Sequence, residues 1–141
     1  MGYRCEHFTL PELVTQAMFK ARGDRCWEML NPALLRTLDL LRKRYGAIMV
    51  NNWESGGPFQ ESGMRDFDTS TGAKFSMHKF GCAADLKPKL ISPEEMQKDI
   101  LLRAADCPLL TCMENAAITR TWLHIDVRNH NQPQQIWIVN P

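Results

Sequence analysis

The chain has 141 residues, of which 44% are hydrophobic and 23% are charged. This length fits one domain spanning residues 1–141, and the composition excludes a disordered chain, a collagen-like fibre and a coiled coil. The 17 basic and 16 acidic side chains give a formal net charge of +1, so no electrostatic footprint for nucleic acid is expected.

No stretch of the sequence has the length and apolar character of a signal peptide or of a membrane span. We therefore expect a protein made in the cytoplasm without a signal peptide and without a membrane partner. The five cysteines are odd in number and include no CxxC pair. This pattern favours free thiols in a reducing compartment over a disulfide framework.

Three helices are predicted from their end signals, since each has a proline in its first turn. The second also has Asn31 as a possible N-cap and Gly46 just past its end, and its leucines form one apolar stripe at helical spacing. The predicted helices run from about Pro11 to Arg22, Pro32 to Tyr45 and Ser92 to Ala105.

Five strands are predicted from runs of β-branched and apolar residues, and a long polar segment, Glu54 to Lys79, separates the first two. A loop of this length is usually functional or disordered. Helices followed by strands with one inserted helix predict an α+β domain with the helices against a small, mostly antiparallel sheet. The predicted strands are Ala47–Trp53, Cys82–Lys87, Leu109–Met113, Thr121–Arg128 and Gln135–Val139.

The residues that carry most chemical information are His78, Asp85 and His124. Asp85 follows an apolar run, where a carboxylate is costly to bury unless a cation or hydrogen bonds compensate. His124 lies in the strand Trp122–Arg128, whose alternation places the imidazole on the polar face. Two histidines and one carboxylate are a common ligand set for a catalytic zinc ion. Spacing alone leaves both a metal site and ordinary structural histidines open.

Three segments carry a more specific signal: Ser62-Gly63-Met64-Arg65, Ser76-x-His78-x-x-Gly81-x-Ala83-x-Asp85 and Trp122-x-His124-x-Asp126. In this order they resemble the S-G-x-R, S-x-H-x-x-G-x-A-x-D and W-x-H-x-D elements of the zinc D-Ala-D-Ala carboxypeptidases and related phage peptidoglycan endopeptidases. The resemblance covers about Val50 to Arg128. It implies the fold that these enzymes share with the hedgehog signalling domain.

The resemblance implies a zinc ion, Zn2+, held by His78, Asp85 and His124. It also implies that Arg65 binds a carboxylate or carbonyl of the substrate, because the planar guanidinium pairs with carboxylate oxygens. The alternative for Arg65 is an ion pair with a neighbouring aspartate, Asp66 or Asp68. Ser76 is expected to steady the site by hydrogen bonding, with a simple turn serine as its alternative.

The general base is where this sequence departs from the family's pattern. Many members place Glu or Asp three residues before the last histidine, and here that position is Thr121. Asp126 is the first replacement, because it shares a strand face with His124. Glu114 is the second, provided that its strand lies beside that of His124. Asp126 could instead orient a histidine.

The sequence therefore predicts a zinc metallopeptidase that hydrolyses peptide bonds in bacterial cell-wall stem peptides or cross-links. A phage or prophage product, released at lysis or carried in a virion, fits the expected absence of targeting signals. The alternative is a non-catalytic zinc-stabilised binding or virion structural module of the same fold, which Thr121 favours. His7 and His130 are expected to be surface histidines, and Trp53 and Trp122 either line the cleft or are half-buried strand aromatics.

Overall fold

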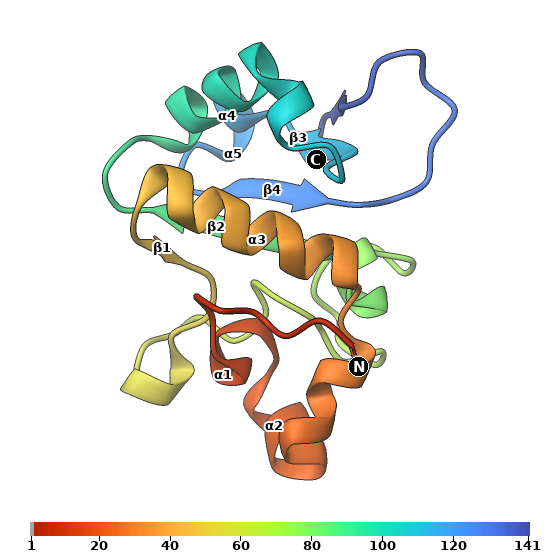
Figure 1. Cartoon of the computed structure of the whole chain (residues 1–141). Coiled ribbons are helices and arrows are strands. Elements are labelled where there is room, and N and C mark those ends of the chain that lie inside the picture. Colours follow the sequence, from red (N-terminus) through yellow and green to blue (C-terminus); the bar gives the residue numbers. More distant parts are fainter. Residues whose placement is uncertain (1) are drawn as a thin grey trace.

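The computed structural model describes residues 2–141, which form five α-helices and one five-stranded mixed sheet (Figure 1). The predicted α+β class is confirmed. The helices are α1 (Leu10–Leu13), α2 (Gln16–Arg22), α3 (Pro32–Tyr45), α4 (Pro93–Leu102) and α5 (Ala116–Thr119). The strands are β1 (Ile48–Met49), β2 (Ala83–Pro88), β3 (Cys112–Glu114), β4 (Leu123–Asp126) and β5 (Trp137–Val139). Short 3-10 helices include η1 (Gly23–Met29), η3 (Met77–Phe80) and η4 (Ala104–Asp106).

The first predicted helix is divided in two, which corrects the expectation of one helix over residues 11–22. Val14 is extended, and the Thr15 hydroxyl accepts a hydrogen bond from Met18 N, so Thr15 caps a new helix. The carbonyl that the break exposes at Val14 accepts hydrogen bonds from the side chains of Asn51 and Trp53. The break therefore connects the N-terminal helices to the chain that follows β1.

The second and third predicted helices form where their end signals place them. Helix α3 has the predicted bounds, and the Asn31 side chain accepts from Ala33 N at 2.8 Å. Helix α4 begins after its N-cap residue Ser92, which forms a capping box with Glu95 in the first turn. It ends at Leu102, earlier than predicted, and the chain continues as η4.

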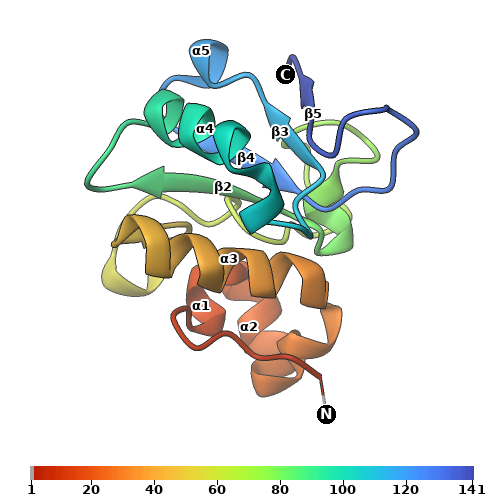
Figure 2. The ribbon, with the colours of Figure 1, turned by 45° about the horizontal axis from the view of Figure 1, so that its top comes forward.

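The sheet has the strand order β1-β2-β4-β3-β5. Three of its pairs are antiparallel, and β5 runs parallel to β3. The sheet is therefore mixed, and the expectation of a mostly antiparallel sheet is corrected. The reason is the long connection after β4, residues 127–136, which returns the chain so that β5 starts at the same end as β3 (Figure 2). Strand β5 runs antiparallel to β4, but β2 and β3 already pair with both edges of β4, so β5 joins the free edge of β3 and is parallel to it.

The two faces of the central strands differ in character. One face joins the main hydrophobic core, together with the buried leucines of α3 and with Met96 and Ile100 of α4. The opposite face carries Asp85 and His124, which are direct partners in the register of β2 and β4. The strand residues in the core are Ala84, Leu86, Leu123 and Ile125.

The long polar segment before β2 follows a defined course, and part of it lies beside the edge of β2. Backbone hydrogen bonds connect Asp85 N to Ser62 O at 2.7 Å and Arg65 N to His78 O at 3.0 Å. The segment ends in η3, which contains His78 and is followed directly by β2. Within residues 2–141, the five cysteines are free. Among the helices of this range, none has both the length and the apolar character required to cross a bilayer.

Gly81 joins η3 to β2 in a left-handed conformation, with φ of 67°. A Cβ at this position would lie 2.1 Å from the carbonyl oxygen of Met29. We expect Gly81→Ala to lower the free energy of unfolding by about 3 kcal/mol, through backbone strain and this steric overlap. Chemical denaturation of the purified variant measures the effect.

Gly56→Ala is the matched control, because Gly56 is also left-handed but has no atom within 4 Å of a built Cβ. Its cost is expected to be about 1–2 kcal/mol, from conformation alone. Equal losses for the two variants would contradict the steric contribution at Gly81.

Candidate metal centre

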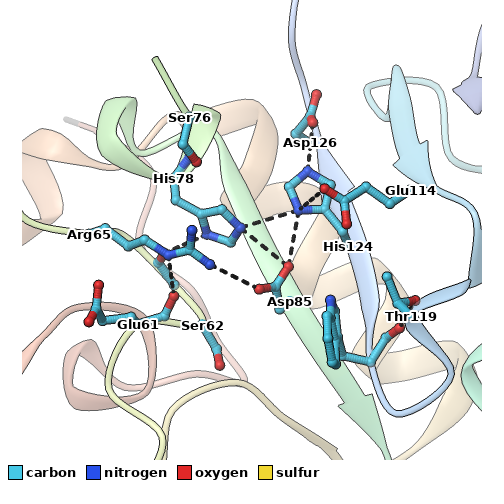
Figure 3. A network of polar contacts seen from close by, with 12 residues as sticks. Glu61, Ser62, Arg65, Ser76, His78, Asp85, Glu114, Thr119, His124 and Asp126 are labelled. Carbon is cyan, nitrogen blue, oxygen red and sulfur yellow. Dashed lines mark hydrogen bonds and ion pairs between the residues drawn. The ribbon is translucent and has the colours of Figure 1, made fainter. Parts of the chain in front are cut away.

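The structure brings His78, Asp85 and His124 together into a group that could hold a metal ion, with one ligand atom from each residue within 4.8 Å of the others (Figure 3). His78 comes from η3, Asp85 from β2 and His124 from β4. Asp85 Oδ1 lies 3.2 Å from His78 Nε2 and 3.0 Å from His124 Nδ1. The two nitrogens are 3.2 Å apart.

The far side of each imidazole is held by an acceptor. His78 Nδ1 lies 2.8 Å from the carbonyl oxygen of Gly63, and His124 Nε2 lies 2.8 Å from Asp126 Oδ2. Because a carbonyl and a carboxylate only accept, the outer nitrogens carry the protons. In a neutral ring the inner nitrogen directs a lone pair toward Asp85, and in a protonated ring the same nitrogen donates a hydrogen bond to it. Histidines that bind metals are oriented in this way.

The buried group attracts positive charge. Burial by itself raises the pKa of Asp85, but hydrogen bonds from His124 and His78 outweigh it and hold that pKa below its usual range. Burial lowers the pKa of His124, and the hydrogen bonds to Asp126 and Asp85 more than reverse this, raising it to about 9. Without a metal, His124 therefore holds a proton at neutral pH, in a position where a metal cation can replace it.

Asp126 lies behind His124, on the side away from Asp85 (Figure 3). Its side chain is fully buried and accepts from Arg128 Nε at 2.8 Å and from the second Arg128 nitrogen at 2.6 Å. Burial raises the pKa of Asp126, but the hydrogen bonds from His124 and Arg128 outweigh it and lower that pKa to about 2. This position matches the alternative role of orienting a histidine.

Glu114 is the second residue that the sequence offered as the general base. Strand β3 pairs with β4, and Glu114 lies one residue beyond the paired Met113 and Ile125. Its Oε1 is 3.9 Å from His124 Nδ1, the nitrogen that faces Asp85, and its side chain is 22% exposed. Glu114 therefore faces the inner side of the group, where Asp126 does not.

Arg65 belongs to the site and forms its ion pair with Asp85. One guanidinium nitrogen lies 3.2 Å from Asp85 Oδ2, and Nε donates to the carbonyl oxygen of Glu61 at 2.7 Å. These contacts occupy the second oxygen of Asp85 and leave Oδ1 to the histidines. Ser76 caps η3, since its hydroxyl accepts from His78 N at 3.3 Å.

Gly63 is a site residue whose role the sequence did not reveal, although it stands in one of the quoted motifs. A Cβ at this position would lie 2.2 Å from the carbonyl oxygen of Leu13. Only glycine therefore allows the segment to pass this close to α1 while its carbonyl orients His78. The motif spacing could have suggested a close backbone approach here, but not its partner.

Two cavities border the group. The larger, about 720 Å³, is lined by residues that include Phe59, Ser62, Lys87 and Thr121. The smaller, about 430 Å³, contains His78, His124, Glu114 and Arg128. Arg65, Thr71, Asp85 and Trp122 line both. Asp85 therefore lies where the two halves of one cleft meet, both histidines line the smaller half, and Trp122 is a wall of both.

Comparisons of the chain with models of protein families, with curated proteins and with solved structures found no match. What the structure itself establishes is a pair of histidines and an aspartate that could hold a metal ion. The chemistry of the site therefore rests on the contacts described above.

We expect the purified protein to bind one divalent metal ion per chain and His78→Ala and His124→Ala each to lose it, because two remaining ligands hold a metal weakly. Metal analysis after dialysis and calorimetric titration measure the binding. His7→Ala is the matched control, since His7 is exposed and lies outside the group. Full metal content in both ligand variants would refute the assignment.

Asp126→Asn is expected to weaken metal binding by about 10- to 100-fold, because the amide no longer supplies a charged acceptor for His124 Nε2. Competition with a chelator measures the affinity. Unchanged affinity together with complete loss of hydrolysis would instead return Asp126 to the role of general base.

Proposed function

We propose that the protein is a zinc-dependent metallopeptidase that cleaves peptide bonds in bacterial cell-wall peptides. The observation that supports this most strongly is the convergence of His78 Nε2, His124 Nδ1 and Asp85 Oδ1 at separations of 3.0–3.2 Å. Ligands about 2.0–2.1 Å from a tetrahedral zinc ion are about 3.3 Å apart. The three atoms therefore fit three corners of such a tetrahedron.

The donor types favour zinc among the common divalent ions. Calcium and magnesium prefer oxygen ligands, whereas imidazole nitrogen suits zinc. Three protein ligands leave a fourth position, which is the arrangement of catalytic rather than structural zinc sites. The cleft on both sides of Asp85 gives a substrate access to that position.

A bound zinc ion supplies Lewis acidity, which lowers the pKa of water and polarises a peptide carbonyl. We assign the proton transfer to Glu114, whose carboxylate faces the inner side of the group and is partly exposed. Glu114 accepts the proton of the attacking water and returns it to the leaving amine. Arg65 fixes Asp85, and its guanidinium lines both halves of the cleft, where it can orient a substrate carbonyl or carboxylate.

The cell-wall substrate follows from the resemblance to the zinc D-Ala-D-Ala carboxypeptidases and phage endopeptidases, as do the family's fold and a phage or prophage origin. Several residues of the shared motifs have a physical task in this site. Ser76 caps η3, Gly81 turns the chain into β2, and the Gly63 carbonyl orients His78. These tasks support the resemblance as more than a chance match of spacing.

The alternative of a non-catalytic zinc module drew its support from Thr121. Thr121 lines the larger cavity, and the carboxylate of Glu114 faces the histidines from the neighbouring strand. The carboxylate that a hydrolase needs is therefore present at another place in the sequence. This observation favours a peptidase over a module that only binds a partner.

Glu114→Gln is expected to retain the metal and to slow hydrolysis by about 100- to 10,000-fold, because glutamine cannot accept the proton of water. Zinc-loaded wild-type protein and the variant are incubated with purified peptidoglycan, and the released fragments are identified by mass spectrometry. Glu94→Gln is the control, since Glu94 is an exposed residue of α4 outside the site.

The fragments also identify the bond that is cut, a terminal D-alanine or a cross-link. A zinc-loaded wild-type protein that releases no fragments would favour the non-catalytic module. Cleavage of casein but not of peptidoglycan would retain the peptidase and reject the cell-wall substrate.

A further inference from the structure

Lys87 places a positive charge in the larger half of the cleft without a carboxylate partner. Its Nζ donates to the Ser62 hydroxyl at 2.8 Å and to the Asp85 carbonyl oxygen at 3.4 Å, and both acceptors are neutral. The ammonium lies 4.3 Å from the centre of the Phe59 ring. Within residues 2–141, no ion pair joins Lys87 to an acidic side chain.

The acidic side chains that line this cavity already have partners. Asp85 pairs with Arg65 and the histidines. Glu61 accepts hydrogen bonds from the hydroxyls of Thr69 and Thr71, and Asp66 accepts one from Thr15. Of the two cations that line this cavity, Arg65 pairs with Asp85, and Lys87 is the one that makes no ion pair within the described part of the chain. A half-buried ammonium of this kind is stabilised by an anion from outside.

Lys87 lies close to the proposed reaction centre. It follows Asp85 by two residues in β2, so both side chains project from the same face of the strand. Two residues of a strand span about 7 Å. Consider an extended peptide whose cleaved bond lies at the metal group. An anionic group of that peptide bound by Lys87 would be about one or two residues away from the cleaved bond.

We propose that the larger cavity is a subsite for a substrate carboxylate and that Lys87 is the residue that recognises it. This inference rests on the proposed peptidase function and names its substrate class: peptides with a carboxylate one or two residues from the cleaved bond. The carboxylate accepts a charge-assisted hydrogen bond from the Lys87 ammonium, with the Ser62 hydroxyl beside it. Arg65 retains its contacts to Asp85 and Glu61.

Two sources can supply the carboxylate, the α-carboxylate at a peptide end or a carboxylate of a side chain. Two pairs of probes separate them. The first pair is N-acetyl-D-alanyl-D-alanine and its C-terminal amide. The second pair is N-acetyl-D-alanyl-D-glutamic acid α-amide and the corresponding glutamine peptide. Each pair differs only in the charge of one group.

Binding is measured by calorimetry on the zinc-loaded Glu114→Gln protein, in which hydrolysis of the probes is slowed. We expect the acid of one pair to bind at least about tenfold more tightly than its neutral partner, the range of a charge-assisted hydrogen bond. Adding Lys87→Gln should remove this preference and change binding of the neutral probe less than twofold. Glutamine removes the charge and keeps a hydrogen-bond donor at a slightly shorter reach.

Lys89→Gln is the matched control, because Lys89 is an exposed lysine two residues further along the chain that lines a different cavity. It removes the same charge and should leave the preference intact. Lys87→Arg should retain at least part of the preference, and thermal unfolding shows whether each variant is folded. The pair that shows the Lys87-dependent preference identifies the source of the carboxylate.

Equal binding of acid and neutral probes, an equal loss of both in Lys87→Gln, or no binding of any probe would overturn the inference. The outcome is independent of the digestion experiment, since the protein used here is the hydrolysis-deficient variant. If wild-type protein cleaves neither peptidoglycan nor casein while Lys87-dependent binding persists, the proposed peptidase fails and the carboxylate subsite stands.

Discussion

Two hydrogen bonds on the far sides of the histidines determine what their near sides can do. The Gly63 carbonyl and the Asp126 carboxylate each take up one imidazole N–H, so the remaining nitrogens face Asp85 with their lone pairs. The lone pairs and the Asp85 carboxylate therefore concentrate negative charge density at one buried point. Only a proton or a metal ion neutralises it. Any affinity of the site for a cation would thus depend on the acceptors behind the candidate ligands as much as on those ligands themselves.

The sheet positions Asp85 and His124, and the long segment before β2 contributes His78 and the carbonyl of Gly63. The register of β2 and β4 sets Asp85 opposite His124, and burial of the alternate residues under the helices holds that register, since a slip by one residue would expose the core. His78 reaches the pair from η3, which is continuous with β2. Strand β3 then places Glu114 beside His124. Two strands, a short helical turn and a neighbouring strand end are sufficient to assemble the site.

The sequence predicted the elements whose signals are local. Helix α3 was predicted because Asn31, a proline and Gly46 bracket an apolar stripe, and His124 was placed on a polar face by alternation along one strand. Features that depend on strand order were not accessible in this way. Whether Asp126 or Glu114 faces the ligand atoms depends on which strand lies beside β4, and a single sequence does not contain that information. The parallel pairing of β5 was not predicted, because the irregular connection before it has no periodic pattern of hydrophobic residues. The helix break at Thr15 was missed because its signal is a single hydroxyl cap.

The close passage of Gly63 against α1 has a consequence for how the molecule would respond to a bound metal ion. Met64 N donates to Leu13 O at 2.8 Å, next to the residue whose carbonyl holds His78. Opening of the first helices would release this backbone contact and with it the orientation of one ligand. By mass action, an ion that binds only the closed arrangement must therefore suppress that opening. Metal occupancy and amide-exchange protection of the N-terminal residues would then be thermodynamically linked, even though these residues would contribute no ligand to the ion.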